Sequence, residues 1–317
     1  MRAARIVAPG HAVVEDAPIP EPKEEQVRIR ISGCGVCSSN LGPWGGLPWT
    51  KYPLEPGDGG HESWGVIDAL GPGVHGLELG DRVAAISYRA YAEYDVAGAN
   101  AVVRLPRELW DVPFPGEAYG CAMNIFRRAN VLAGSTVAVV GVGFLGALVV
   151  RLASAAGARV IGISRRESSL ALARRMGASH VVPESGRSEV VRAVEELTGG
   201  ELCDRVFELV GKQEPLDLAG ELTGTRGTLV IGGYHQDGER RVNMQLWNWR
   251  GLDVINAHER ELARYTEGVA FATEAVAALH IDPAELSTHS YPLERLGDAL
   301  DATLTKPDGF VKAIVVP

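Results

Sequence analysis

The chain has 317 residues, of which 46% are hydrophobic and 22% are charged, and its formal net charge is −9. A chain of this length buries a large core and is expected to form two domains, because single cores stop growing near about 250–300 residues. The acidic balance and the absence of a lysine- or arginine-rich tract argue against nucleic acid and membrane partners and favour a small molecule. Four cysteines are too few for a disulfide framework, and no signal peptide is recognisable, so we expect a cytoplasmic protein with reduced thiols.

The N-terminal part, to about residue 111, contains short β-like runs separated by glycine and proline turns. These runs are 26–33, 63–71 and 81–87. The pattern predicts an all-β or irregular domain.

After residue 113 the pattern changes to an alternation of strands and helices. Expected strands are 136–143, 159–164, 180–182, 203–211 and 227–234, and expected helices are 144–158, 168–178, 188–200 and 215–224. Segment 129–150 carries no charge and has the length of a membrane span, but its four glycines indicate a turn, a buried strand and a helix start. The alternation predicts a parallel sheet with helices on both faces. Two helices, 262–279 and 293–304, and a strand, 309–316, are expected to follow.

A glycine motif lies at the first of these strand-to-helix junctions. Gly141, Gly143 and Gly146, with Phe144 and Leu145 between the last two, match G-x-G-x-x-G. In a dinucleotide site the first glycine makes the tight turn, the second lets a pyrophosphate approach, and the third lets helix and strand pack closely. The alternative is a tight turn in some other α/β fold.

The end of the second strand bears on the choice of coenzyme. A protein that prefers NAD places an acidic residue there for the ribose hydroxyls, but this chain has Ser164, Arg165 and Arg166. The two arginines predict a pocket for a 2′-phosphate, so NADP(H) is expected, with NAD possible. A solvated helix start is the alternative.

Cys34 and Cys37 form a Cys-x-x-Cys pair, which suits a metal site, a redox pair or neither. A four-cysteine zinc site needs a second such pair, and a thioredoxin-like redox pair lies near the start of a βαβ unit. Neither context exists here, so Cys34 is interpreted as a packed neighbour.

Several stretches together resemble one family. They are GVCSSN (35–40), GGHESWGV (59–66), LGPGVHGLELGDRV (70–83), YAEY (91–94), GEAYGCAMNIFRRANVLAGSTVAVVGVGFLG (116–146) and GFVKAIVV (309–316). With them the chain resembles the zinc-dependent medium-chain alcohol and polyol dehydrogenases, in particular the sorbitol-dehydrogenase-like members, over essentially its whole length. The resemblance implies an α/β protein with a GroES-like catalytic domain (1–118 and 257–317), a Rossmann domain (119–256), and an active site in the cleft between them.

The resemblance also implies a catalytic zinc ion. Its ligands map onto Cys37, His61 and Glu117, a set that leaves one coordination position open, as catalytic zinc requires. Cys121, one turn after Glu117 if this segment is helical, is the rival third ligand. Glu62 is expected to approach the metal or to support its ligands.

Two residues depart from the family pattern, and one family feature is missing. Asn40 replaces the aspartate that orients the zinc-bound histidine; its amide oxygen can still accept a hydrogen bond from His61 but brings no charge. Gly42 stands where several members carry a proton-relay histidine, so Ser39 is the candidate for contact with the substrate hydroxyl. Only residues 88–90 occupy the position of the family's structural-zinc lobe, so a single catalytic ion is expected.

The resemblance implies hydride transfer between NADP(H) and a secondary alcohol or ketone, with zinc as a Lewis acid. Ser39, Cys37, His61 and Glu62 are the candidate catalytic residues, and Lys312 is expected either to reach the coenzyme pyrophosphate or to be a surface charge. Candidate contacts for a polyol or sugar-like substrate are Trp44, Trp49, Tyr88, Trp247, Trp249 and His258, with a place in the core or at an interface as the equal alternative for each. Segment 243–258 maps to a sheet edge that pairs subunits, so a homodimer or homotetramer is expected. The alternatives are a zinc-free reductase of activated double bonds and a non-catalytic NADPH-binding protein.

Overall fold

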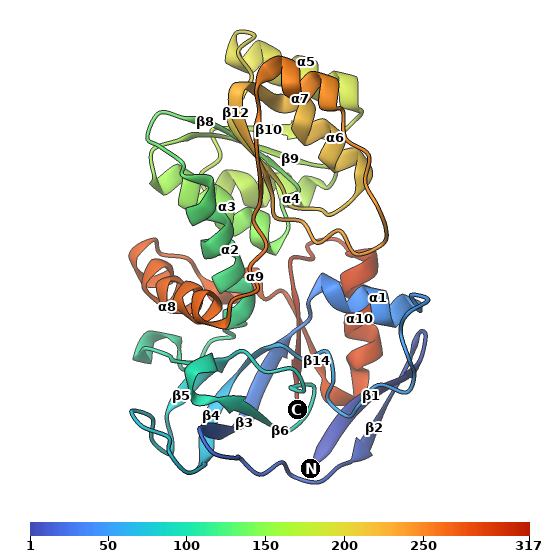
Figure 1. The fold of residues 1–317 in the computed structure, drawn as a ribbon, viewed down its shortest axis with the longest axis vertical. Helices are drawn as coiled ribbons and strands as arrows, with labels where there is room; N and C mark the ends of the chain where they lie inside the picture. Colours follow the sequence, from blue (N-terminus) through green and yellow to red (C-terminus); the bar gives the residue numbers. More distant parts are fainter. The chain divides into compact units, whose positions relative to one another are not determined.

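The computed structural model describes residues 1–317 and divides them into two compact units (Figure 1). Unit 1 comprises residues 1–120 and 260–317, and unit 2 comprises residues 121–259. The sequence placed these divisions after residues 118 and 256. None of the helices combines the length and the apolar character that crossing a membrane requires.

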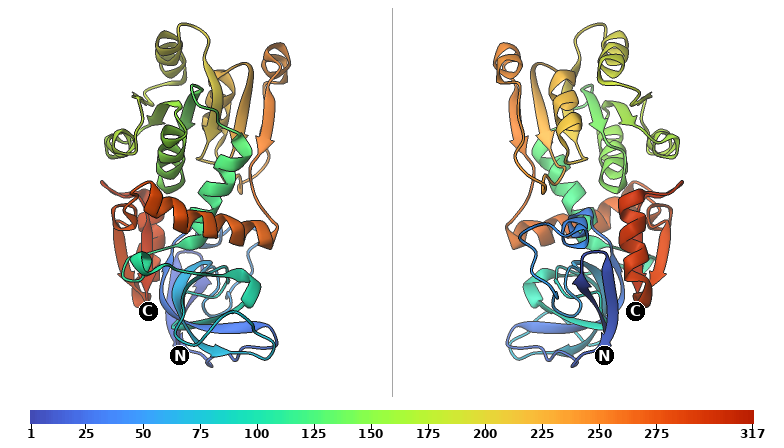
Figure 2. Two further views of the ribbon diagram at one scale, coloured as in Figure 1. Left: turned by 90° about the vertical axis from the view of Figure 1, so that its left-hand side faces the viewer. Right: turned by 90° about the vertical axis from the view of Figure 1, so that its right-hand side faces the viewer.

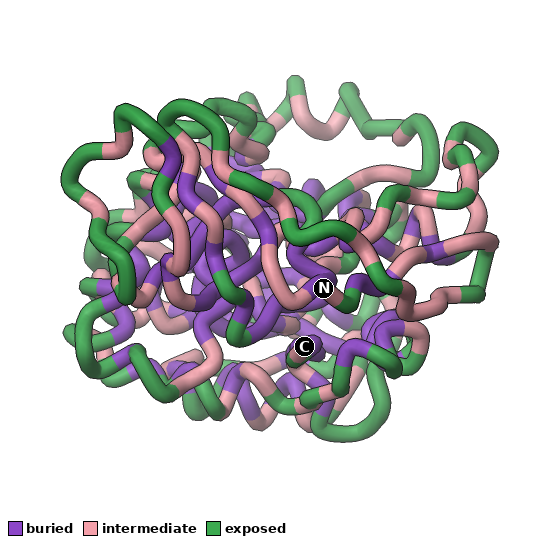
Figure 3. Tube along the Cα trace, turned by 90° about the horizontal axis from the view of Figure 1, so that it is seen from below, coloured by how far each residue is buried: buried purple, intermediate pink, exposed green.

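Unit 1 is built mainly from antiparallel strands. They are β1 (Arg2–Ala8), β2 (His11–Asp16), β3 (Gln26–Gly35), β4 (Glu62–Leu70), β5 (Arg82–Ala85), β6 (Tyr94–Gly98), β7 (Val102–Arg104), β14 (His289–Pro292) and β15 (Ala313–Val316). One sheet has the order β14-β15-β3-β4-β5-β7, with β6 also on β3, and β1 and β2 form a separate pair. In Figure 3 the buried segments lie inside and the exposed segments form the outer turns.

The helices of unit 1 are short, except near its C-terminal segment. They are α1 (Leu41–Gly45), the start of α2 (Gly116–Ala129), α8 (Leu262–Ala278), α9 (Pro283–Leu286) and α10 (Leu296–Thr305), with a 3₁₀ turn at Ser38–Asn40. The predicted helix 262–279 is present as α8. The helix expected at 293–304 begins with a 3₁₀ turn, and the last strand covers only four of the eight residues expected.

Unit 2 is a parallel sheet with connecting helices. The elements are β8 (Thr136–Val140), α3 (Phe144–Ala155), β9 (Arg159–Ser164), α4 (Glu167–Arg175), β10 (His180–Pro183), α5 (Arg187–Thr198), β11 (Cys203–Glu208), α6 (Gln213–Leu222), β12 (Thr223–Ile231), α7 (Met244–Arg250) and β13 (Asp253–Asn256). The strand order is β10-β9-β8-β11-β12-β13, and every neighbouring pair is parallel. This is the Rossmann strand order, which confirms the predicted doubly wound sheet.

The strand order reverses direction between β8 and β11, and this determines where the helices lie. The chain runs from β8 to β9 and β10 toward one edge, then from β11 to β12 and β13 toward the other. Because parallel crossovers are right-handed, α3 and α4 cover one face of the sheet, and α5 and α6 cover the other (Figure 2). Residues 137–140 of β8 are completely buried, as expected for a central parallel strand.

The segment 243–256 differs from expectation in its first half. The family resemblance places a sheet edge at 243–258, but the segment forms α7 before β13. The side chain of Asn243 caps α7 by accepting the N–H of Leu246 at 3.0 Å, and Gly251 ends it with a φ of 61°. The strand β13 therefore has only four residues, and it lies at the edge of the sheet.

Candidate metal centre and coenzyme site

Three potential metal ligands meet at one end of the β3–β4 pair. The register of this pair places Gly35 opposite Glu62, so Cys37, two residues after β3, comes near His61, the residue before β4. Ligand atoms of Cys37, His61 and Glu62 lie within 4.8 Å of one another. Antiparallel pairing thus joins two motifs that are separated by more than twenty residues in the chain.

The charges around His61 would suit a cation. Burial acts to lower the pKa of His61, but the hydrogen bond to Cys37 and the negative charges of Cys37, Glu117 and Glu62 raise it to about 10. The negative charges around His61 therefore stabilise a proton on its ring, and a divalent cation bound there would be stabilised by the same charges. Thiolate, imidazole and carboxylate are the ligand types of zinc sites, so the residues fit that metal.

The proton on the His61 ring is also placed correctly for metal binding. Its Nδ1 lies 2.8 Å from the carbonyl oxygen of Gly59. A carbonyl can only accept, so Nδ1 carries the hydrogen, and in the neutral ring Nε2 keeps the lone pair that a metal needs.

Asn40 does not have the contact that the sequence predicted. Its Nδ2 donates to the carbonyl of Gly59 at 3.0 Å and to the hydroxyl of Tyr91 at 2.6 Å. The expected bond from the His61 ring to the amide oxygen is absent, because the Gly59 carbonyl takes that hydrogen instead. Asn40 therefore supports His61 through a shared acceptor and not by direct contact.

Glu117 lies in the first turn of α2 and is mostly buried. Its charge raises the pKa of His61, but its carboxylate does not belong to the group of mutually close ligand atoms, in which Glu62 is present instead. Cys121, the alternative third ligand, follows one turn later on the same helix. The segment is therefore helical, as the alternative assignment of Cys121 requires.

Glu62 is held by a buried ion pair that was not foreseen. The Lys312 ammonium lies 2.7 Å and 2.9 Å from the two carboxylate oxygens of Glu62 and 3.4 Å from the carbonyl of Val36. A Cβ at Gly35 would lie 1.9 Å from the same carboxylate, so only glycine leaves room for it. The surface-charge interpretation of Lys312 is wrong, because the residue is 6% exposed.

The electrostatics of Lys312 agree with this pairing. Burial acts to lower its pKa, but the charges of Glu62, Cys37 and Glu117 outweigh burial and raise it. The ammonium is directed at Glu62, where the sequence expected a coenzyme pyrophosphate. Its pairing also neutralises one of the carboxylates near the candidate ligands.

The remaining residues of the first motif have distinct surroundings. Ser39 is partly exposed, and its N–H donates to the Cys37 sulfur at 3.5 Å. Gly42 is buried in α1. Burial raises the pKa of Cys34 well above its usual value, and its thiol donates to the Gly35 carbonyl, which agrees with a packed and unreactive side chain.

The glycine loop of unit 2 has the geometry that its motif requires. Gly141 has a φ of 96°, which favours glycine, and a Cβ at Gly146 would lie 2.1 Å from the Gly141 carbonyl oxygen. A Cβ at Gly143 would meet no atom within 4 Å, so space remains beside the start of α3. Phe144 and Leu145 are the first residues of that helix, and the N–H groups at a helix N-terminus suit an anion.

The residues after the second strand partly match expectation. β9 ends at Ser164, which is 8% exposed and whose hydroxyl accepts the Arg166 N–H at 3.5 Å. Arg165 is exposed and forms no ion pair, so its guanidinium is available for a phosphate. Arg166 is partly buried and occupies the N-cap position of α4 without a side-chain capping hydrogen bond.

The candidate substrate contacts do not behave alike. Trp44 is buried and donates its indole N–H to Asp301 at 2.8 Å, which indicates a packing role. Tyr88 is 66% exposed, and its ring centroid lies 6.4 Å from that of His61. Trp49 and Trp249 are exposed, whereas Trp247 packs on the core of unit 2.

His258, the last of these candidates, contacts the ring of Tyr234 at 5.3 Å within unit 2. Sequence reasoning also missed Glu208, a fully buried carboxylate at the end of β11. A charge at the end of a buried apolar run was the available signal.

Comparison with known proteins matches both units. The model of the alcohol dehydrogenase GroES-like domain covers residues 23–122, and that of the zinc-binding dehydrogenases covers residues 145–274. An NAD-dependent alcohol dehydrogenase of Sulfurisphaera tokodaii is 30% identical, over 74% of this chain and 78% of that protein. A sorbitol dehydrogenase of Bacillus subtilis is 24% identical, over 96% of this chain and 94% of that protein. The crystal structure of a zinc-binding dehydrogenase of Sinorhizobium meliloti bound to NADP has a TM-score of 0.86 at 24% identity, over 100% and 99% of the two chains, and shows the same fold.

Proposed function

Since the chain belongs to the zinc-dependent medium-chain alcohol and polyol dehydrogenases, we propose that it transfers hydride between NADP(H) and a secondary alcohol or ketone of the polyol class. When bound, zinc supplies Lewis-acid polarisation of the substrate oxygen, and the nicotinamide supplies or accepts the hydride. The chain's own residues hold these groups and move the proton.

We propose Cys37, His61 and Glu117 as the zinc ligands, because the Glu62 carboxylate, although close to Cys37 and His61, is paired with Lys312, and the charge of Glu117 also acts on His61. The Gly59 carbonyl keeps Nε2 of His61 available, and Lys312 holds the carboxylate of Glu62 by its ion pair. Ser39 relays the proton of the substrate hydroxyl, because its oxygen accepts that proton as its own hydroxyl hydrogen leaves. Because Gly42 offers no side chain, that proton passes from Ser39 to solvent.

The observation that carries the proposal is the set of anionic donors around His61. A cluster that raises the pKa of a buried histidine to about 10 has excess negative charge, and a divalent cation relieves it. Metal analysis of the purified protein tests this directly. Replacement Cys37→Ser should abolish zinc binding and turnover, whereas the matched control Cys34→Ser should keep both. Retained zinc in Cys37→Ser, or two metal ions per chain, would contradict the proposal.

The preference for NADP(H) follows from the end of β9. Ser164 brings no carboxylate to repel a 2′-phosphate, and the exposed Arg165 can pair with it. A charge-assisted hydrogen bond contributes roughly 1.5–3 kcal/mol, equivalent to a preference of about 10- to 150-fold. Steady-state kinetics with both coenzymes should show that preference, and Ser164→Asp combined with Arg165→Ala should reverse it. Equal values of kcat/KM for NADP(H) and NAD(H) in the native protein would contradict this preference. Arg165 and Arg166 would then be only the charged start of a helix.

The substrate class follows from the family and from the exposed ring of Tyr88 near His61. Aromatic faces and hydroxyl groups suit the ring stacking and hydrogen bonding of sugar-like ligands. An activity screen over polyols, simple secondary alcohols and ketones should show the highest kcat/KM with a polyol. A Tyr88→Ala variant should raise KM for that polyol more than for a simple secondary alcohol.

We place the subunit contact at β13. This strand forms one edge of the six-stranded sheet, and the residues at both of its ends are exposed. An exposed edge strand carries unpaired N–H and C=O groups that a second copy can pair. The expected assembly is a dimer or a dimer of dimers.

A further inference from the structure

Glu208 is a carboxylate that the proposed chemistry does not use. It is 0% exposed and ends β11. One of its oxygens accepts the N–H groups of Val210 and Gly211 at 2.8 Å and 2.7 Å, and the other lies 3.0 Å from Nε2 of His235. A buried charge with these partners is a stable element of the structure, because three donors replace the water it has lost.

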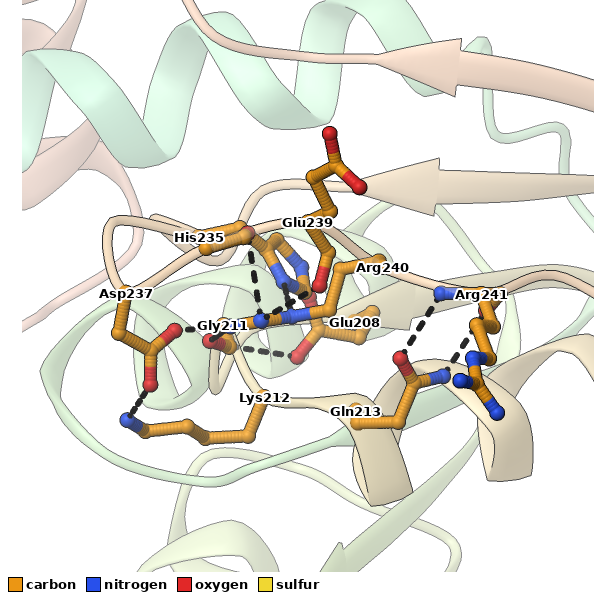
Figure 4. Close-up of polar contacts among 10 residues, drawn as sticks. Glu208, Gly211, Lys212, Gln213, His235, Asp237, Glu239, Arg240 and Arg241 are labelled. Atoms are coloured by element: carbon orange, nitrogen blue, oxygen red, sulfur yellow. Dashed lines mark hydrogen bonds and ion pairs between the residues drawn. The ribbon is translucent and has the colours of Figure 1, made fainter.

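The protonation of His235 is determined by its two neighbours. Nε of Arg240 lies 2.8 Å from Nδ1 of His235 and can only donate, because an arginine guanidinium stays protonated. Nδ1 must therefore accept, and the ring hydrogen is on Nε2, which donates to Glu208. His235 is thus a neutral imidazole held between a cation and an anion (Figure 4).

Arg240 also connects two loops of unit 2. One of its terminal nitrogens donates to the Gly211 carbonyl at 3.1 Å and pairs with Asp237, which in turn pairs with Lys212 (Figure 4). Gly211 and Lys212 follow β11, whereas Asp237 and Arg240 follow β12. Arg240, from the loop after β12, therefore contacts the loop after β11, and Lys212, from the loop after β11, contacts the loop after β12.

Two further contacts fix the register of these loops. The Gln213 amide donates to the Arg241 carbonyl at 2.9 Å and accepts the Arg241 N–H at 3.0 Å. A Cβ at Gly233 would lie 2.3 Å from the Gly211 nitrogen, and one at Gly211 would lie 2.5 Å from the Tyr234 carbonyl oxygen. The backbones touch, so a small displacement of one loop displaces the other.

The joined loops lie at the place where this fold binds dinucleotides. Ligands of open α/β sheets bind at the carboxyl ends of the strands, at the point where the strand order reverses, which here lies between β8 and β11. The loop after β11 is next to the glycine loop, because a Cβ at Gly141 would meet Val210 at 2.5 Å. Glu208, which binds the backbone of the loop after β11, therefore supports one side of the expected dinucleotide site.

We propose that His235 is a positioning residue, which with Glu208 and Arg240 holds the loops after β11 and β12 in the conformation that binds the coenzyme. This inference rests on the proposed function, since it requires a dinucleotide in unit 2. His235 acts through the two loops and touches neither coenzyme nor substrate in this assignment.

The test compares variants that keep or remove the two hydrogen bonds of His235. His235→Phe keeps a ring but removes both bonds, whereas His235→Gln keeps an N–H for Glu208 and an oxygen for Arg240. We expect His235→Phe to weaken NADPH binding by roughly 10- to 100-fold. Binding is measured by titrating the zinc-loaded protein and following the fluorescence of NADPH. His235→Gln should stay within about threefold of the native protein, and kcat at saturating coenzyme should change little in both. The exposed His180, replaced by Phe, is the matched control and should have no effect.

A second measurement tests the network without coenzyme. Nitrogen-15 NMR of the histidine rings should show His235 protonated on Nε2, with its signals identified by their loss in His235→Gln. Glu208→Gln should disturb this tautomer, because an amide N–H would face the ring N–H, and hydrogen exchange in residues 234–243 should become faster. If His235→Phe does not fold, Arg240→Met should weaken NADPH binding in the same direction, because it removes the donor to Nδ1 of His235 together with the contacts of Arg240 to Gly211 and Asp237.

Unchanged NADPH affinity in a folded His235→Phe or Arg240→Met protein would overturn the inference, as would an Nδ1-protonated ring. These results differ from failure of the proposed function, in which the native protein itself shows no zinc and no turnover.

Discussion

Replacement of Asn40 by aspartate tests the arrangement around His61, because sequence and structure predict opposite results. The family pattern suggests that a carboxylate at position 40 would strengthen His61 as a ligand and tighten zinc binding. In the structure the Asn40 amide is a donor in both of its contacts, at 3.0 Å to the Gly59 carbonyl and at 2.6 Å to the Tyr91 hydroxyl. An ionised aspartate has no hydrogen to donate to that carbonyl.

The size of the effect follows from these contacts. One net hydrogen bond, worth about 1 kcal/mol, is lost at Gly59, and a carboxylate oxygen then faces a carbonyl oxygen at about the same distance. Burial holds the pKa of Tyr91 well above its usual value, so its hydroxyl keeps its hydrogen and can turn to the aspartate, which offsets part of the loss. Because the same carbonyl orients His61, we expect zinc affinity to fall by about 10- to 100-fold, the usual range for a residue that supports a ligand.

Competition with a chelator gives the zinc affinity of each variant, and thermal unfolding of the metal-free proteins reports damage to the fold. Tyr91→Phe is the matched control, since it removes one partner of Asn40 and leaves the Gly59 contact, and it should keep zinc affinity within a few-fold. Equal or tighter zinc binding by Asn40→Asp would refute the reasoning. That result would mean that position 40 contacts the His61 ring directly.

Four further predictions concern both units. Glu117→Gln should lower zinc retention more than Cys121→Ser does, and the reverse order by metal analysis would transfer the ligand role to Cys121. Gly146→Ala should lower the free energy of unfolding by about 1–3 kcal/mol in urea titrations, because its Cβ would lie 2.1 Å from a carbonyl oxygen of the glycine loop; unchanged stability would disprove that contact. Val254→Asp, on the exposed edge strand, should yield monomers in sedimentation, whereas an unchanged assembly would place the interface elsewhere. In the metal-free protein the folded pKa of His61, about 10, exceeds its unfolded value of about 6.5, so its contribution to stability is complete below pH 6.5 and is lost as the pH rises through 10. Urea midpoints should show this decline in the metal-free native protein and less of it in His61→Gln; equal declines would contradict the assignment.

Features that depend on neighbouring residues were available from the sequence. The glycine motif, with Gly141 and Gly146, is recognisable within six consecutive residues, because the tight turn and the close packing there exclude a side chain. The alternation of strands and helices is recognisable from the spacing of the hydrophobic residues. Cys37 and His61 were predicted as partners because the family resemblance supplied their pairing. The parallel sheet and the helix 262–279 were predicted from such local patterns, and the structure confirms both.

The polar contacts that orient these groups were decided only by the tertiary structure. Lys312 meets Glu62 across 250 positions of sequence, and Glu208 meets His235 across 27. Asn40 could in principle accept from His61 or donate to Gly59, and the sequence alone does not distinguish these directions. A hydrogen bond forms only where donor and acceptor face each other within about 3 Å, and that depends on the packing of strands and loops distant in the chain. Composition and local pattern therefore predicted which groups are present, and the fold determined which atom of each group faces its partner.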